Sequence, residues 1–387
     1  MSNKIRSIST EKLLQLINTY IYYFFCGGKA APLPVYKNVN YEITYRCNLK
    51  CKFCFWWNES SRRENLTKIS SRSELTFDEI KNLILPQFQS VGLKYVNLTG
   101  GEPLVRKDIF EVIRLFTHSG MQVSMISNLA NISEKQAEAL VNSGLKCLKV
   151  SVDGPPDIHD QTRGVKGTYT QVINTIENIQ KYKKATDVNT PSIILNGVIC
   201  KETMSCFSHL LDIANEFELN GVSLQFLEWQ TEHSIDQMKR IEGFDSNEVY
   251  SSALHVNNGI EPSLILKELK NARQKSTRFN VPLVIVPLSI PQSINTREID
   301  LWFKDSTFNF VKKCSFPFRS FFINPYGDVR PCIEVTMGNL KENQLYEIWN
   351  SQKYNKFRKK LKEKGIFQRC AKCCQIRPWD RYLRSVW

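Results

Sequence analysis

The sequence predicts an α/β fold in which a mostly parallel sheet curves into a partial barrel of six strand–helix units. Short β-rich runs alternate with helical stretches from about residue 41 to residue 227. The β-rich runs are nearly continuous in apolar residues, as is typical of parallel strands covered on both faces. Repeated strand–helix alternation is the pattern of α/β proteins, and six units of similar length favour a TIM-like partial (β/α)6 barrel. The expected strands are 41–45, 95–99, 122–127, 145–152, 193–200 and 222–227.

Five helical stretches connect these strands, and two of them begin with a capping box. In a capping box the N-cap hydroxyl and a Glu or Gln three residues later each bind a backbone N–H group of the other. Thr76 is followed by Glu79, and Ser133 is followed by Gln136. The expected helices are 76–90, 108–119, 133–143, 168–183 and 205–218.

The composition indicates a globular protein with a sizeable core. The 387 residues suggest roughly two to three domains, and 42% of them are hydrophobic. A formal net charge of +14 is compatible with nucleic acid, a membrane surface or an anionic substrate as partner, and equally with a solvated lysine-rich surface. The densest basic run, 353–364, mixes lysines and aromatics at helical spacing and predicts an exposed helix face. We therefore expect no specific nucleic-acid partner.

Six of the 12 cysteines cluster in two places, three in 47–54 and three in 370–374. A secreted disulfide scaffold would be shorter and would need an oxidising compartment. Clustered cysteines in an enzyme-sized chain indicate metal binding by reduced thiolates, so we expect a cytoplasmic protein. The four cysteines without ligand spacing are expected to be structural; they are Cys26, Cys147, Cys200 and Cys206.

The N-terminal segment 13–25 is apolar but shorter than the ~20 residues that span a bilayer. A signal peptide is rejected because the cysteine chemistry needs reduced thiols. We expect a helix packed on the protein's own core; the alternative is an interfacial helix with peripheral membrane contact. The expected domains are a helical extension at 1–38, the barrel at 39–230, a connecting segment at 231–313 and a small C-terminal domain at 314–387.

The unusual residues of the first domain follow the ends of successive predicted strands. Cys47 follows the first strand, Gly100 to Pro103 the second, Asn128 the third and Asp153 the fourth. Active sites of parallel sheets lie at the carboxyl ends of the strands. All these residues are therefore expected on one rim.

Cys47, Cys51 and Cys54 form a C-x3-C-x2-C pattern. Thiolates bind zinc or iron–sulfur clusters, and a structural zinc site would need a fourth Cys or His nearby. The nearest histidine, His118, lies in a predicted helix far along the chain. A [4Fe–4S] cluster on three cysteines keeps one iron open for a small molecule. The triad therefore favours a cluster.

The stretch "CNLKCKFC" resembles the signature of radical S-adenosylmethionine (SAM) enzymes, and the resemblance extends over about residues 39–230. It implies that SAM binds the open iron through its amino and carboxylate groups. It also implies reductive cleavage to methionine and a 5′-deoxyadenosyl radical, with an electron donor such as flavodoxin or ferredoxin. The implied fold is the same partial (β/α)6 barrel.

Companion motifs carry the resemblance further. "TGGEP" (Thr99, Gly100, Gly101, Glu102, Pro103) is similar to the family segment that holds the methionine amino group, whereas on its own it would be a tight loop. "SNL" and "SVDGPPDIHDQTRG" imply ribose contacts and, for Arg163, the ligand carboxylate; the alternative for Arg163 is a surface ion pair. Leu129 stands where the family often has glycine. The residues implied for these contacts are Ser127, Asn128, Ser151, Asp153 and Arg163, with Val198 and Phe53 at the adenine.

The tail resembles the C-terminal SPASM or shorter "twitch" iron–sulfur domain of such enzymes. A full SPASM domain carries roughly seven cysteines, and this tail has five, so one auxiliary [4Fe–4S] cluster is expected. The alternative is a structural zinc on the same thiolates. Cys374 is spare: an inert neighbour, another ligand or a hydrogen donor. The expected ligands are Cys314, Cys332, Cys370 and Cys373.

These features predict a radical SAM enzyme that abstracts hydrogen from a C–H bond, with peptide or protein modification as the favoured reaction. The catalytic residues are not assigned. One alternative is a dehydrogenase or epimerase of a small molecule such as a sugar, an aminocyclitol or a lipid-linked sugar. A more distant alternative is a basic zinc protein that binds nucleic acid.

Overall fold

The computed structural model describes residues 38–54, 72–240, 259–332 and 335–376. One ten-stranded sheet runs through it in the order β10-β9-β8-β1-β2-β3-β4-β5-β6-β7. The expected segment 13–25 and Trp56 and Trp57 lie outside the described residues. The strands are β1 Asn38–Thr44, β2 Tyr95–Gly100, β3 Gln122–Ser127, β4 Cys147–Ser151, β5 Ser192–Ile199, β6 Gly221–Phe226, β7 Leu283–Val286, β8 Phe321–Ile323, β9 Asp328–Arg330 and β10 Gly338–Asn339.

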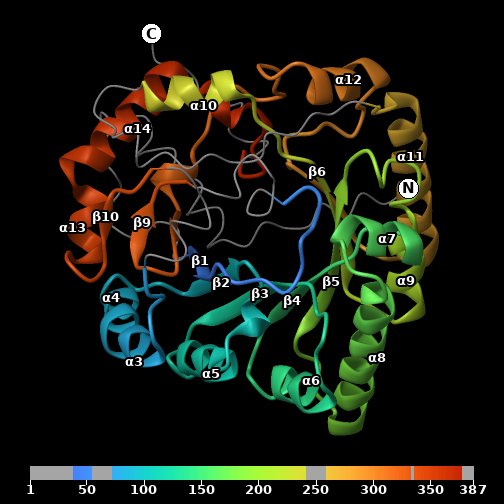
Figure 1. Cartoon of the computed structure of the whole chain (residues 1–387), viewed down its shortest axis with the longest axis horizontal. Coiled ribbons are helices and arrows are strands. Elements are labelled where there is room, and N and C mark those ends of the chain that lie inside the picture. Colours follow the sequence, from blue (N-terminus) through green and yellow to red (C-terminus); the bar gives the residue numbers. More distant parts are fainter. Residues whose placement is uncertain (1–37, 55–71, 241–258, 333–334, 377–387) are drawn as a thin grey trace, which may run out of the picture.

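The first six strands pair in parallel and in chain order, as the alternating pattern predicts. Helices cover the outer side of this curved sheet, which confirms the α/β fold (Figure 1). The helices are α3 Phe77–Glu79, α4 Leu85–Ser90, α5 Ile109–His118, α6 Glu134–Val141, α7 Pro156–Arg163, α8 Thr168–Thr186, α9 His209–Glu216, α10 Glu232–Lys239, α11 Pro262–Phe279, α12 Thr296–Lys304, α13 Leu345–Asn350 and α14 Gln352–Lys364.

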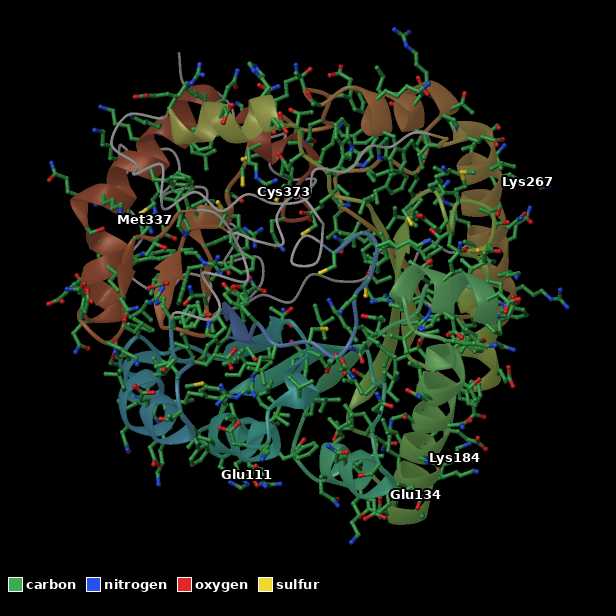
Figure 2. The ribbon with its side chains drawn as sticks, viewed as in Figure 1. Glu111, Glu134, Lys184, Lys267, Met337 and Cys373 are labelled. Atoms are coloured by element: carbon green, nitrogen blue, oxygen red, sulfur yellow. The ribbon has the colours of Figure 1, made fainter. Side chains whose placement is uncertain are left out.

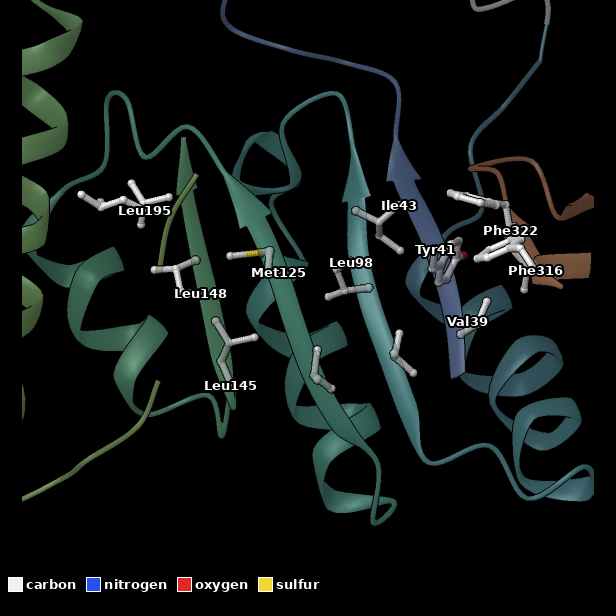
Figure 3. Packing of buried hydrophobic residues seen from close by; sticks show 14 of the residues in the cluster. Val39, Tyr41, Ile43, Leu98, Met125, Leu145, Leu148, Leu195, Phe316 and Phe322 are labelled. Carbon is white, nitrogen blue, oxygen red and sulfur yellow. The ribbon is translucent and has the colours of Figure 1, made fainter. Parts of the chain in front are cut away.

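Alternate residues of each strand form the core between the sheet and its helices. On β1, Val39, Tyr41 and Ile43 are fully buried in the main hydrophobic cluster, together with Leu98 of β2 and Met125 of β3 (Figure 3). Successive side chains of a strand point to opposite faces. The intervening residues of these strands are therefore available to line the inner face of the barrel.

Local sequence patterns explain where several helices begin and break. The capping boxes at Thr76 and Ser133 are both formed. The expected helix 76–90 is divided by a π-helical turn at Ile80–Ile84, directly before α4. Pro86 lies in the first turn of α4, where its missing N–H breaks the regular bonding pattern.

The C-terminal region joins the barrel through its first strand rather than standing apart as a separate sheet. β8 pairs in parallel with β1, with Phe322 opposite Asn40, and β9 and β10 follow antiparallel. At the other edge, β7 pairs in parallel with β6. The connecting segment 231–313 thus supplies a seventh parallel strand of the barrel.

Candidate functional site

A cavity of about 360 Å³ opens at the carboxyl ends of the parallel strands. Thr99 and Gly100 at the end of β2, Ser127 at the end of β3 and Ser151 at the end of β4 contribute to its wall. The predicted residues that line the cavity are Cys47, Cys51, Phe53, Cys54, Thr99, Gly100, Gly101, Glu102, Ser127, Asn128, Ser151, Arg163 and Val198. Among the predicted SAM contacts, Pro103 and Asp153 are not part of this lining, and neither are the four expected auxiliary ligands.

The loop after β1 brings the three thiols of Cys47, Cys51 and Cys54 to one side of this cavity. They form a small cluster with Leu49 and Ala130. The Cys54 N–H donates to the Cys51 carbonyl at 3.0 Å, and the Leu49 N–H donates to Cys47 Sγ at 3.5 Å. Burial raises the pKa of the Cys47 thiol to about 11. Metal binding must therefore displace a proton from this thiol.

Gly100 and Gly101 allow β2 to pass directly against the cysteine loop. The Gly101 N–H donates to the Thr44 carbonyl at 2.7 Å, and the Glu102 N–H donates to the Arg46 carbonyl at 2.8 Å. A Cβ at either glycine would lie 2.2 Å from one of these carbonyl oxygens. The two glycines thus fix the distance between β2 and the cysteine loop.

Glu102 places a buried carboxylate in the cavity wall. Ser127 Oγ donates to its Oε1 at 2.8 Å, and the Asn128 N–H donates to its Oε2 at 2.7 Å. Burial raises the pKa of Glu102, although these two donors and the Leu104 N–H oppose the shift. The carboxylate accepts hydrogen bonds on both oxygens, so its orientation is set by β3 as well as β2.

Arg163 makes a buried ion pair with Asp153, so it is not the surface ion pair that was the alternative for this residue. Its Nε lies 2.6 Å from Asp153 Oδ2, and its side chain is 8% exposed. Its Nη1 lies 3.6 Å from Cys51 Sγ, and its guanidinium stacks over Phe53. Burial works to lower the pKa of Arg163, but the charges of Asp153 and Cys51 leave it raised. Asp153 also accepts from the Val198 N–H at 3.1 Å, so it lies behind the wall and supports it.

His159 supports the same corner from α7 and remains neutral. The Asp153 N–H donates to its Nδ1 at 3.2 Å. Burial lowers the pKa of His159 to about 4, with Arg163 acting in the same direction.

The C-terminal thiols form a second group. Cys332, Cys370 and Cys373 lie within electrostatic reach of one another, and burial raises the pKa of Cys332 to about 12. Cys314 is buried in the main hydrophobic cluster, against which Cys332 and Cys370 also pack. Cys373 lies in the upper central part of the molecule (Figure 2).

Cys374, expected to be an inert neighbour, faces the first cavity and not only the second thiol group. Its N–H donates to Glu228 Oε1 at 2.8 Å, and Gln375 Nε2 donates to its Sγ at 3.2 Å. A hydrogen bond with Cys373, together with burial, raises the pKa of the Cys374 thiol. A wall of the cavity therefore comes from the C-terminal cysteine loop.

The sequence patterns did not reveal a buried ion pair that joins β9 to β1. Arg330 of β9 is fully buried and donates from Nη2 to Oε2 of Glu42, a residue of β1 that lines the cavity. The Tyr45 hydroxyl donates to the same oxygen at 2.8 Å. No local motif marks Glu42 or Arg330; only the pairing of β8 with β1 brings them together.

The first thiol group suits an anionic iron–sulfur cluster. Three cysteines meet at one cavity wall, and the guanidinium of Arg163 beside Cys51 favours negative charge there. In the described part of the chain, no three His, Cys, Asp or Glu side chains lie close enough to hold a single ion. A cluster is wider than one ion, so its ligands lie further apart. The adjoining cavity has room for a small molecule, and a cluster site beside such a cavity defines a barrel enzyme of the iron–sulfur class.

Comparisons with known proteins give the family. Residues 41–213 match the sequence model of the radical SAM superfamily, and residues 314–374 match SPASM, an iron–sulfur cluster-binding domain. The chain belongs to the radical SAM superfamily and carries a C-terminal SPASM domain. It is a radical SAM enzyme whose cofactors are a [4Fe–4S] cluster and SAM, and its SPASM domain implies auxiliary iron–sulfur clusters.

Relatives with different activities resemble this chain. It is 26% identical over 347 residues to the AdoMet-dependent heme synthase of Methanosarcina barkeri, covering 87% of each chain. It is 29% identical to the sporulation killing factor maturation protein of Bacillus subtilis, over 43% of this chain and 37% of that one.

Solved structures confirm the fold. Streptococcus suis SuiB bound to its precursor peptide superposes with a TM-score of 0.59 at 15% identity, covering 89% of this chain and 71% of that one. The structure of anSMEcpe with bound AdoMet and a peptide gives 0.57 at 18% identity, covering 89% and 86%. No helix within the described ranges is both long and apolar enough to cross a membrane.

Proposed function

We propose that this radical SAM enzyme modifies a peptide or protein at a C–H bond. The observation that supports it is the wall of the cavity beyond the cysteine loop, which is rich in carboxamides. A carboxamide both donates and accepts hydrogen bonds, as a peptide group does, so such a wall suits a polypeptide. The carboxamides in the lining beyond Asn128 are Asn40, Asn97, Gln225, Gln230 and Gln375.

Several of these carboxamides are held in place while keeping further hydrogen-bonding capacity. Asn97 Nδ2 donates to Asn40 Oδ1 at 3.0 Å, and Ser124 Oγ donates to Asn97 Oδ1 at 3.0 Å. Gln230 Nε2 donates to the Arg369 carbonyl at 2.9 Å. Each carboxamide offers two N–H groups and two lone pairs, so these bonds fix the side chains and leave groups for a substrate.

Different residues of the cavity are proposed to bind the cluster and the different parts of SAM. When bound, the cluster and SAM supply the one-electron chemistry for hydrogen abstraction. Cys47, Cys51 and Cys54 hold the cluster, and Glu102 accepts from the SAM amino group. Arg163, held by Asp153, faces the SAM carboxylate. Ser127, Asn128 and Ser151 contact the ribose, and Phe53 and Val198 lie at the adenine. Cys314, Cys332, Cys370 and Cys373 are the proposed ligands of one auxiliary cluster.

The proposed limits of the radical SAM core, 39–230, and of the auxiliary domain, 314–387, contain the two family matches at 41–213 and 314–374, and β7 extends the sheet of the core beyond residue 230. Apolar residues in the cavity lining, among them Ile126, Leu227 and Phe322, limit the access of water to the reacting atoms.

A second candidate is modification of a tetrapyrrole, favoured by the 87% coverage of the heme synthase relative. Carboxylate side chains of such a substrate would call for several cations in the wall. Arg163 and Arg369 are the basic residues of the lining, and Arg163 is already paired with Asp153. The lining also carries Glu228, which would repel an anionic substrate, whereas Glu42 is already paired with Arg330. The electrostatics of the cavity thus favour the peptide.

The test uses the anaerobically reconstituted enzyme with SAM and a reductant. One set of reactions receives peptides encoded by neighbouring open reading frames, and another receives Fe-coproporphyrin III, the product named for another relative. We expect a defined mass change in one peptide, with 5′-deoxyadenosine formed in proportion. A mass change of the tetrapyrrole alone would instead establish the second candidate.

A further inference from the structure

A buried lysine, Lys372, stands inside the C-terminal cysteine loop. Its residue is 1% exposed, although lysine is almost never fully buried unless paired. Its Nζ lies 4.8 Å from the ring centroid of Trp302 and 5.4 Å from those of Trp229 and Phe308. It donates to the Phe308 carbonyl at 2.8 Å. Three aromatic faces and one carbonyl thus enclose the amino group.

This aromatic cage is itself attached to the end of β6. Trp229 Nε1 donates to the Trp302 carbonyl at 2.9 Å, and Trp302 Nε1 donates to the Leu227 carbonyl at 3.2 Å. Leu227 and the next residue, Glu228, line the cavity. A side chain held in the cage is therefore tied to the strand end that forms the substrate wall.

Three further contacts hold the same loop against the barrel. The Cys374 N–H donates to Glu228 Oε1 at 2.8 Å, and Gln230 Nε2 donates to the Arg369 carbonyl at 2.9 Å. Asn309 Nδ2 donates to the Ala371 carbonyl at 2.5 Å. Lys372 occupies the middle of the loop. Through its amino group the loop contacts Trp229, Trp302 and Phe308 at this end of the barrel.

We propose that Lys372 is a positioning residue that seats the loop Cys370–Cys374 on the end of β6, so that the auxiliary thiols and the cavity wall are set together. The proposal rests on the assignment of Cys370 and Cys373 as auxiliary ligands and is independent of the substrate. Loss of the amino group leaves the cage and the Phe308 carbonyl without their partner. The loop then shifts, and with it the spacing of two of the four thiols.

The test is made in a chain with Cys47, Cys51 and Cys54 all changed to Ala, so that iron reports on the auxiliary site alone. Lys372→Met keeps the aliphatic stem and removes the amino group; Lys364→Met, at an exposed lysine of α14, is the matched control. After anaerobic reconstitution, iron and sulfide per chain and the electron paramagnetic resonance (EPR) spectrum of the reduced cluster are measured. We expect Lys372→Met to lose at least half of the iron and sulfide and to shift or lose the EPR signal, with Lys364→Met unchanged.

Two further measurements separate positioning from general damage. Lys372→Arg keeps a cation and N–H donors, and we expect it to recover most of the iron and the EPR signal. With the first cysteine triad intact, Lys372→Met should retain the rate of SAM cleavage measured without substrate. If Lys372→Met does not accumulate as folded protein, Trp229→Phe, which removes one bond of the cage and keeps an aromatic ring, must shift the EPR signal.

Full iron and an unchanged EPR spectrum in Lys372→Met, or in Trp229→Phe where that variant replaces it, would overturn the proposal. Equal losses of SAM cleavage and of iron would also overturn it, because they would indicate general unfolding. A triad-free chain that binds no iron even with Lys372 present would show instead that the auxiliary ligands are wrongly assigned.

Discussion

A methyl group added at Gly101 would press on the loop that carries the first cysteine triad. Its Cβ would lie 2.2 Å from the Arg46 carbonyl oxygen, 2.7 Å from the Arg46 carbonyl carbon and 2.8 Å from the Tyr45 carbonyl oxygen. Ordinary contacts begin at 3.4 Å. All three neighbours are backbone atoms, so no side-chain rotation relieves the overlap. The loop must move by about 1 Å, a displacement that can cost about 100-fold in rate.

Gly101→Ala should therefore fold with a stability loss of about 1–3 kcal/mol, the usual cost of overpacking. Because Cys47 follows Arg46 directly, we expect weaker iron loading of the first triad and SAM cleavage reduced about 100-fold. Iron analysis, SAM cleavage followed by 5′-deoxyadenosine release, and denaturant unfolding measure the three effects.

Gly120→Ala is the control for this prediction. Gly120 has a φ of +80° and no atom within 4 Å of an added Cβ, so its cost is backbone strain alone, about 1–2 kcal/mol. It should lose stability and keep normal iron and cleavage. Wild-type cleavage in Gly101→Ala would refute the reasoning, because it would show that the cysteine loop tolerates the displacement.

Three other perturbations test the buried charges. Arg330→Met should cost about 3–5 kcal/mol of unfolding free energy, because it leaves the Glu42 carboxylate buried without its partner. Adding Glu42→Gln should recover most of that loss. Equal stability of the single and double variants would contradict this explanation. Arg163→Met should cost a similar amount through Asp153 and lower the iron bound by the first triad, and retention of both would show the ion pair to be dispensable. The folded pKa of His159 is about 4, below the ordinary 6.5, so the unfolded chain binds its proton first as the pH falls. Roughly 3 kcal/mol of stability should be lost between pH 6.5 and 4, and His159→Asn should flatten the melting temperature over that window; an unchanged pH profile would exclude His159 as its origin.

Local sequence patterns predicted the barrel because each of its strands and helices is specified by residues that lie close together in the sequence. The capping boxes at Thr76 and Ser133 fixed two helix starts, and apolar runs gave the six strands in the order in which they pair. The basic run 353–364, predicted to be an exposed helix face, lies in α14, which begins where Ser351 accepts from the Tyr354 N–H. One face of α14 is nevertheless buried, through Tyr354, Phe357 and Leu361.

The candidate site was predicted where motif residues are contiguous and missed where distant segments meet. Cys47, Cys51 and Cys54 are marked by spacing, and they share one cavity wall. Arg330 carries no such mark, because its partner Glu42 is 288 residues away. A single sequence without covariation holds no record of that contact.

The pairing of β1 with β8 has a consequence for synthesis on the ribosome. β1 begins at Asn38, and its partner strand begins at Phe321. At roughly 5–20 residues per second, tens of seconds separate the two. Throughout that interval one edge of β1 presents unpaired N–H and C=O groups, the kind of edge that templates aggregation. A chaperone that covers this edge should therefore raise the yield of folded chain, and slower translation, which lengthens the interval, should lower it.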